Sequence, residues 1–135
     1  MANTGESTHS TFDERRFPIV IVKLPQRPLV GEAFEEHCRK AFSYFERGQS
    51  FAWVFDSRDS ASLPADQRRI IAELTDASMA KHPSVRCFVA VVVASAVQRG
   101  VVKAITWLTR QPVPTAVVAS VGEGVAWAER MLART

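Results

Sequence analysis

The sequence contains little cysteine, no long apolar run and no large excess of either charge. Its two cysteines, Cys38 and Cys87, are too few for a disulfide scaffold, and too few for a zinc site without other ligands. We therefore expect a reducing compartment, the cytoplasm. The longest apolar run, Phe88 to Ala94, is far shorter than the roughly 18 residues that span a bilayer. Residues 1–14 also lack the apolar segment of a signal peptide, so we expect neither a membrane span nor secretion.

The charge balance bears on nucleic-acid binding. Lysine and arginine together number 17 and the acidic residues 14, which gives a formal net charge of +3. A nucleic-acid-binding domain usually concentrates a larger basic excess on one face, so a nucleic-acid partner is not expected. The length of 135 residues and the hydrophobic share of 47% fit one globular domain. We expect a polar N-terminal tail over residues 1–14, with a possible short edge strand at Ser10–Asp13, and one domain over residues 15–135.

Apolar runs rich in β-branched and aromatic residues alternate with segments of helical periodicity. The runs are Phe17–Leu24, Phe51–Phe55, Val85–Val93 and Pro114–Ala119. Because most of their residues are apolar, both faces of the sheet should be covered, which is typical of parallel strands. The segments expected to be helical are Glu32–Arg47, Ser62 to His82, Ala96–Thr109 and Val121–Ala133. The pattern predicts a single-domain α/β fold with a mainly parallel sheet of four or five strands and four helices.

Short motifs indicate where the helices begin and end. Ser95-x-x-Gln98 and Ser120-x-x-Glu123 are capping boxes, in which the hydroxyl accepts a hydrogen bond from a backbone amide of the first turn. Gly48 is expected to end the first helix. Ser62 is expected to cap the second helix, with Pro64 in its first turn. The buried stripe predicted for the second helix consists of Ile70, Ile71, Leu74 and Ala77.

Polar residues gather after the ends of the predicted strands. In open α/β sheets, ligands bind outside the carboxyl ends of the strands, next to helix N-termini. The candidate partner- or ligand-binding residues at this edge are Asp56, Ser57, Arg58, Asp59, Ser60, Ser95 and Ser120. Two interpretations are open for the loop Asp56–Ser62. It is either an ordinary capped connection or a recognition surface, which its seven residues favour because a minimal connection needs fewer.

No combination of residues specifies a reaction. A nucleophilic serine needs a base within about 3 Å, and the histidines are expected elsewhere. His9 lies in the tail, His37 within the first helix and His82 at the opposite edge of the sheet. Gly122-x-Gly124 lacks the third glycine of a dinucleotide-binding motif. We therefore expect no catalytic residue, no metal site and no cofactor.

Several stretches carry a family resemblance. They are Phe51–Asp56, Ala104–Leu108, Thr115–Ala119 and Glu123–Trp127. These stretches resemble the SpoIIAA-like superfamily, the fold shared by STAS domains and small standalone STAS/SEC14-type proteins. The resemblance covers about residues 17–132 and implies a bacterial regulatory protein that acts through protein partners. The segment Asp59-Ser60-Ala61-Ser62-Leu63 matches in part the sequence that is phosphorylated in anti-sigma-factor antagonists, which implies Ser60 as a possible phosphosite.

Two classes of function follow from these observations. The leading hypothesis is a non-catalytic STAS-like interaction module with a protein partner. The alternative is a binding protein or enzyme for an anionic or lipid-like small molecule at the carboxyl edge of the sheet. We also expect a homodimer, because Trp107 and Trp127 lie on amphipathic helices of a small domain whose sheet has at least one edge to protect.

Overall fold

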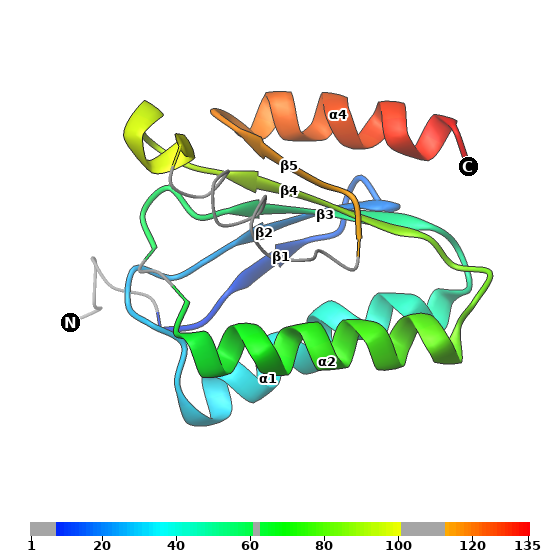
Figure 1. The fold of residues 1–135 in the computed structure, drawn as a ribbon, viewed down its shortest axis with the longest axis horizontal. Helices are drawn as coiled ribbons and strands as arrows, with labels where there is room; N and C mark the ends of the chain where they lie inside the picture. The colour runs from blue at the N-terminus through cyan, green and yellow to red at the C-terminus, as the bar shows by residue number, and fades with distance from the viewer. Residues whose placement is uncertain (1–7, 61–62, 101–112) are drawn as a thin grey trace.

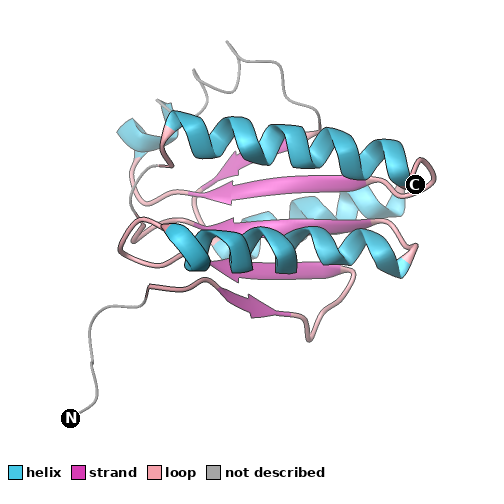
Figure 2. Ribbon diagram, turned by 90° about the horizontal axis from the view of Figure 1, so that it is seen from below, coloured by secondary structure: helices cyan, strands magenta, loops and turns pink. Residues whose placement is uncertain are grey.

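A five-stranded sheet forms the centre of the structure, a computed structural model that describes residues 8–60, 63–100 and 113–135. The strands are β1 (Thr11–Asp13), β2 (Ile19–Lys23), β3 (Phe51–Asp56), β4 (Cys87–Val92) and β5 (Thr115–Val118). They lie side by side in that order. β1 is antiparallel to β2, and the other neighbours are parallel, as the arrows in Figure 2 show. The prediction of a mainly parallel α/β sheet is therefore confirmed, with five strands.

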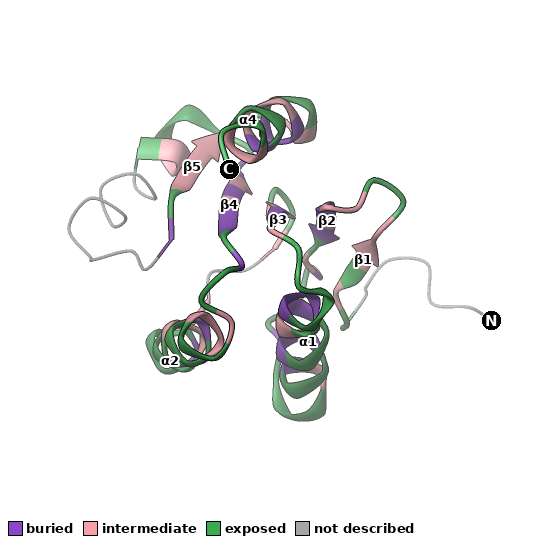
Figure 3. Cartoon of the chain, turned by 90° about the vertical axis from the view of Figure 1, so that its right-hand side faces the viewer, coloured by how far each residue is buried: buried purple, intermediate pink, exposed green. Residues whose placement is uncertain are grey.

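Helices cover both faces of this sheet. α1 (Gly31–Ser43) and α2 (Ala65–Lys81) lie on one face, and α4 (Val121–Ala133) lies on the other (Figure 1). The end-on view in Figure 3 shows the sheet between these two layers. Residues 96–100 are helical, and the remainder of the predicted helix Ala96–Thr109 lies outside the described residues.

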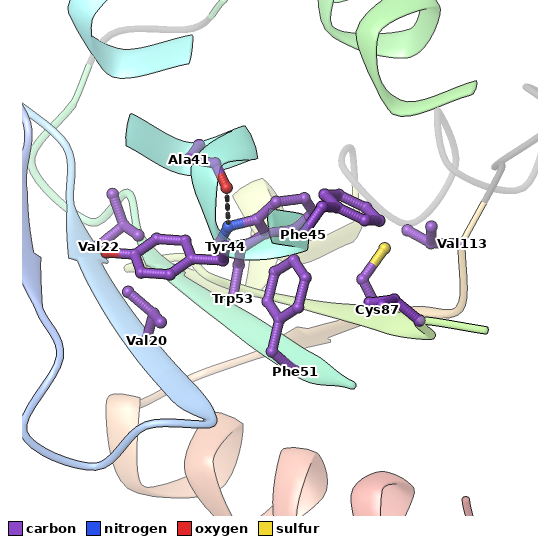
Figure 4. Close-up of a cluster of buried hydrophobic side chains, with 10 residues drawn as sticks. Val20, Val22, Ala41, Tyr44, Phe45, Phe51, Trp53, Cys87 and Val113 are labelled. Atoms are coloured by element: carbon purple, nitrogen blue, oxygen red, sulfur yellow. Dashed lines mark hydrogen bonds between the residues drawn. The ribbon is translucent and has the colours of Figure 1, made fainter. Parts of the chain in front are cut away.

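The core between the sheet and α1 is largely aromatic. Tyr44, Phe45 and Phe51 are almost completely buried, and the Trp53 Nε1 donates a hydrogen bond to the carbonyl of Ala41 at 3.1 Å (Figure 4). The rings of Phe51 and Trp53 meet edge to face, with centroids 5.0 Å apart, an arrangement that aromatic pairs favour. The Trp53 ring also meets the Phe42 ring of α1 edge to face, with centroids 5.6 Å apart. β3 therefore holds the C-terminal end of α1 through a ring contact as well as through the hydrogen bond to Ala41.

The other face of β3 packs against α4. Because side chains alternate along a strand, Ala52 and Val54 face α4 while Phe51 and Trp53 face α1. α4 comes very close at Gly124, where an added Cβ would lie 2.8 Å from the Val54 Cγ1. The glycine is therefore required by the close approach of helix and sheet.

The ends of α1 and α4 follow the predicted motifs. α1 continues into the short 3₁₀ helix η1 (Tyr44–Arg47), which ends at Gly48 with a left-handed φ of 70°. That conformation is accessible to glycine without a steric penalty. At the start of α4, the Ser120 Oγ accepts from the Glu123 N at 3.1 Å, as the capping box predicts.

The predicted inward face of α2 is wrong except at Ile71, which packs against the cluster of Leu29, Phe34 and Cys38. Ala77 of the predicted stripe is exposed. Ile70 and Leu74 are exposed, by 38% and 37%, whereas Gln67 and Thr75 are buried. Each of these buried side chains donates a hydrogen bond: the Gln67 Nε2 donates to the Leu29 carbonyl at 2.6 Å, and the Thr75 Oγ1 donates to the Ile71 carbonyl at 2.7 Å. These bonds allow the helix to bury polar positions that a hydrophobic pattern assigns to solvent.

The start of α2 also differs from the prediction. The N-cap is Pro64, which offers no side-chain cap, and the helix proper begins at Ala65. Pro64 therefore precedes the first turn instead of lying within it. Ser62, the predicted cap, lies outside the described residues.

The N-terminal segment packs against α1 and η1. We call residues 8–17 the N-terminal strap. Within it, the Glu14 carboxylate accepts a hydrogen bond from the Tyr44 hydroxyl at 2.6 Å and pairs with the Lys40 Nζ at 2.6 Å and the Arg47 Nη2 at 3.1 Å. The Arg47 guanidinium also lies over the Phe17 ring, 4.3 Å from its centroid. Residues 1–14 were expected to be a polar tail with a possible short edge strand. Where the structure describes them, they form β1 at the edge of the sheet and pack against α1 and η1.

Candidate functional site

The carboxyl ends of the parallel strands meet at one edge of the sheet, as predicted. We call this the carboxyl edge. The residues after β3, β4 and β5 all lie there, because these strands are parallel and adjacent. The loops are linked directly: the Ser57 N donates to the Val92 carbonyl at 3.0 Å, and the Val93 N donates to the Val118 carbonyl at 3.0 Å. The sheet thus brings the predicted site residues to one edge.

Asp56 is the buried anchor of this edge. Its side chain is 5% exposed and accepts three hydrogen bonds from Arg58: from Nε at 2.8 Å, from Nη2 at 2.9 Å and from the backbone N at 3.3 Å. These bonds lower the pKa of Asp56, since they stabilise the charged carboxylate more strongly than burial destabilises it. The Lys23 Nζ lies 3.7 Å from the same carboxylate. Asp56 therefore stays ionised and orients Arg58.

The serines of the predicted site all bond to the backbone. The Ser57 Oγ donates to the Val92 carbonyl at 2.7 Å, and the Ser60 Oγ donates to the Ser57 carbonyl at 3.1 Å. The Ser95 Oγ accepts from the Gln98 N at 3.0 Å, and Ser120 caps α4. These contacts are those of a capped connection, and they give the edge a defined shape.

A hollow of about 160 Å³ lies beside the end of β2. Its lining residues are His9, Thr11, Lys23, Leu24, Pro25, Gln26 and Asp59. The Lys23 Nζ pairs with the Asp59 carboxylate at 3.3 Å, and both side chains are more than half exposed. The hollow thus carries one accessible charge of each sign, contributed by two neighbouring strand ends.

Only Asp59 among the predicted site residues lines this hollow. The sequence analysis did not single out Lys23, although its position carries a signal. Lys23 is the charged last residue of an apolar strand and pairs in register with Asp56, the equivalent residue of β3. Two polar ends of neighbouring parallel strands indicate a shared site. The sequence has no such signal for His9 and Thr11, because they line the hollow only when the N-terminal strap packs against the sheet.

A second, smaller notch lies between the β2–α1 loop and the start of α2. Its volume of about 10 Å³ is close to that of one water molecule, and Ser60, Pro64 and Gln67 are among its lining residues. The Gln67 Oε1 is buried and has no hydrogen-bond partner in the part of the chain that the structure describes.

The histidines lie away from the hollow, except for His9. His82 ends α2, is partly buried and pairs with the Glu46 carboxylate at 3.3 Å. The sequence analysis expected no histidine beside a candidate serine of the carboxyl edge. The one serine that contacts a buried histidine in the described residues is Ser10 of the strap, away from that edge. The Ser10 Oγ lies 2.8 Å from the His37 Nδ1. Because His37 is buried against the rings of Phe12 and Phe55, this contact belongs to the packing of the strap on α1.

The described residues show neither a metal-ion cluster nor a membrane-spanning helix. Over the described ranges, no three histidine, cysteine or acidic side chains are grouped so that they could hold a metal ion. None of the helices within those ranges is long and apolar enough to cross a bilayer.

Comparison with known proteins identifies the fold. No protein-family model and no curated protein matches the sequence. Among solved structures, the chain is similar to an uncharacterized protein of the DUF3478 family with a SpoIIAA-like fold, from Shewanella loihica. The match has a TM-score of 0.60 at 14% identity and covers 95% of this chain and 98% of the other. The structural match confirms the fold that the sequence resemblance implied: this chain has a SpoIIAA-like α/β fold.

Proposed function

We propose that the chain is a non-catalytic interaction module that binds a protein partner at the carboxyl edge. The observation that carries this proposal is that hydrogen-bonded polar side chains and exposed charged side chains lie together at this edge. Asp56, Ser57 and Ser60 are held by hydrogen bonds within the edge, whereas Lys23 and Asp59 are exposed beside the hollow. Preorganised polar groups bind at a lower entropic cost than mobile ones.

The Lys23–Asp59 pair indicates how a protein partner would bind. Lys23 and Asp59 bond to each other across neighbouring strand ends, and a partner with complementary charges can replace both halves of this exposed pair. Exposed pairs contribute little to folding, about 0–1 kcal/mol. Exchanging this pair for contacts with a partner therefore has a small cost in stability.

We further propose Ser60 as a site of regulation by phosphorylation. Its hydroxyl is half-buried and donates to the Ser57 carbonyl. A phosphate here would add about 1.5–2 negative charges next to Asp59. The Ser60→Asp variant should therefore weaken partner binding and change the free energy of unfolding by less than about 1 kcal/mol. Ser60→Ala, which adds no charge, should leave binding close to that of the wild type.

A charge-reversal pair tests the binding surface. Asp59→Lys changes an acid that is 61% exposed and pairs with Lys23. Glu46→Lys is the matched control, because Glu46 is also 61% exposed and pairs with a lysine, Lys81, at the opposite edge of the sheet. A partner captured by the wild type and measured by calorimetry should lose at least tenfold in affinity with Asp59→Lys. Equal affinities for both variants would contradict the proposal.

The hollow supports the small-molecule alternative. Its volume of about 160 Å³ and its lining by Lys23, Asp59 and Thr11 suit a small polar ligand that carries an anionic group for Lys23. Native mass spectrometry of the gently purified chain separates the two functions. A stoichiometric bound metabolite that is lost in Lys23→Met would favour this alternative over the protein partner.

A further inference from the structure

A histidine lies buried beneath the N-terminal strap. His37, on α1, is 6% exposed. The Ser10 Oγ bonds to its Nδ1 at 2.8 Å, and the Phe12 ring lies 5.8 Å from it. On its other side lies the Phe55 ring of β3, at 6.1 Å. His37 is therefore enclosed between the strap, its own helix and the sheet.

The strap that covers His37 is short and also forms part of the candidate site. Its only strand, β1, has three residues and pairs with the outer edge of β2. His9 and Thr11 of the strap line the hollow beside Lys23. Movement of the strap would therefore open the hollow on one side and free the edge of β2 at the same time.

We propose that the strap is an acid-sensitive cover, in which protonation of His37 favours release of β1 from β2 and opens the hollow. The reason is the environment of the ring. An imidazolium at this position would be enclosed by aromatic rings and would have a serine hydroxyl as its polar neighbour. Burial of an uncompensated charge is costly, so the protonated ring favours states in which water reaches it.

The charged groups around His37 do not compensate for its charge. Most of those on the strap, α1, β2 and β3 are paired with one another, and the others, Arg16, Glu32, Glu35 and Arg39, are exposed to solvent. The pairs are Glu36 with His9, Glu14 with Lys40, Asp13 with Arg15, Lys23 with Asp59, and Asp56 with Arg58. Burial accordingly lowers the pKa of His37 from 6.5 to about 4. The neutral ring is therefore the stable form of His37 while the strap is closed.

The direction of the pH effect follows from this difference. Once the strap opens, His37 titrates near its ordinary value of 6.5, so the open state binds more protons than the closed state between pH 6.5 and about 4. The closed strap is fully favoured above pH 6.5 and loses that preference as the pH falls toward 4. The opening equilibrium should rise by roughly 30-fold between pH 7.5 and pH 5.

Hydrogen exchange at pH 7.5 and pH 5 tests this proposal on the intact chain. After correction for the intrinsic rates, protection of the β1–β2 amides should fall roughly 30-fold at pH 5. Protection of the central β3–β4 amides should change much less, which distinguishes local release from global unfolding. His37→Gln retains a neutral hydrogen-bonding side chain and should remove the pH dependence.

Three control variants keep the result interpretable. His82→Gln and His9→Gln make the same chemical change elsewhere and should retain the acid sensitivity. His9 is the stricter control, because it lies on the strap itself and lines the hollow. If His37→Gln does not fold, Ser10→Ala replaces it: this variant should open the strap more at both pH values and keep the pH dependence.

Equal protection of the β1–β2 amides at both pH values, or a pH dependence that persists in His37→Gln, would overturn the proposal. Failure of the partner-binding proposal would leave this measurement unaffected.

Discussion

At the scale of single residues, Gly124 is the position where the packing allows least change. An alanine there would place its Cβ 2.8 Å from the Val54 Cγ1 and 3.4 Å from the Ala90 Cβ. Both neighbours are completely buried, so neither can move away without disturbing the sheet. Overpacking costs about 1–3 kcal/mol and exceeds the helix-propensity gain of about 1 kcal/mol. Gly124→Ala should therefore lower the free energy of unfolding, measured by urea denaturation, by about 1–2 kcal/mol.

Gly122→Ala is the matched control for this prediction. Gly122 lies in the same helix and is exposed, and the nearest atom to an added Cβ is the Ser120 Oγ at 3.9 Å. The substitution should leave stability unchanged or raise it by up to about 1 kcal/mol. If both variants behaved alike, the close approach of α4 to β3 would not be the cause.

Glu14 contributes a pH-dependent part of the stability. Hydrogen bonds from Lys40 and then from Tyr44 lower its pKa from 4.5 to about 2. Between these values the unfolded chain binds more protons, so the stabilisation is complete above pH 4.5 and is lost as the pH falls toward 2. Glu14→Gln should lower the free energy of unfolding by about 1 kcal/mol at pH 7, since Lys40 and Arg47 remain partly solvated.

Urea denaturation of this variant at several pH values checks both parts of the prediction. The loss relative to the wild type should shrink between pH 4.5 and pH 2. Glu129→Gln is the control, because Glu129 is exposed on α4 and forms no ion pair within the described part of the chain. A constant difference between Glu14→Gln and the wild type down to pH 2 would contradict the assigned role of Glu14.

At the scale of secondary-structure elements, the start of α4 depends on one hydroxyl. The Ser120 Oγ accepts from the Glu123 N, and the Glu123 carboxylate accepts from the Ala119 N at 3.2 Å. Ser120→Ala should cost about 1 kcal/mol in thermal or chemical denaturation. Ser120→Asp keeps an acceptor at the cap and should stay within about 0.5 kcal/mol of the wild type. Equal losses for the two variants would show that the cap is not what matters here.

The sequence predicts the bounds of α4 better than the buried face of α2. The bounds Val121–Ala133 were predicted correctly because a capping box marks the start of the helix and an amphipathic stripe continues from it. In α2 the inward face could not be predicted, because Gln67 and Thr75 are buried through hydrogen bonds to backbone carbonyls. One of these carbonyls belongs to Leu29, 38 residues away in sequence. Periodicity contains no information about such distant acceptors.

At the scale of the whole molecule, the edge of the candidate site was predictable and its exact lining was not. Parallel strands bring the residues after β3, β4 and β5 to one edge, whatever their side chains do. The hollow, however, also depends on the N-terminal strap, which is held by contacts such as Glu14 with Tyr44, 30 residues apart. A short polar segment of sequence gives no sign of these contacts, and it was expected to be a tail with a possible short edge strand.

Self-association is a separate prediction for the whole molecule. The edge strands of the described sheet are β1, which has three residues, and β5, which has four. All four residues of β5 are half-buried. Trp127 packs edge to face on Phe88, with ring centroids 6.5 Å apart, and Trp107 lies outside the described residues. Sedimentation equilibrium at high micromolar concentration should show a dimer. A strict 15.0 kDa monomer would remove this expectation.

The most direct test of the proposed interaction surface is hydrogen exchange of the chain with and without its captured partner. If the carboxyl edge binds the partner, exchange should slow in residues 23–30 and 57–60, which surround the hollow and the Lys23–Asp59 pair. Residues 46–50 and 81–86 at the opposite edge should exchange at unchanged rates. Slower exchange at that opposite edge, with none around Lys23 and Asp59, would contradict the account.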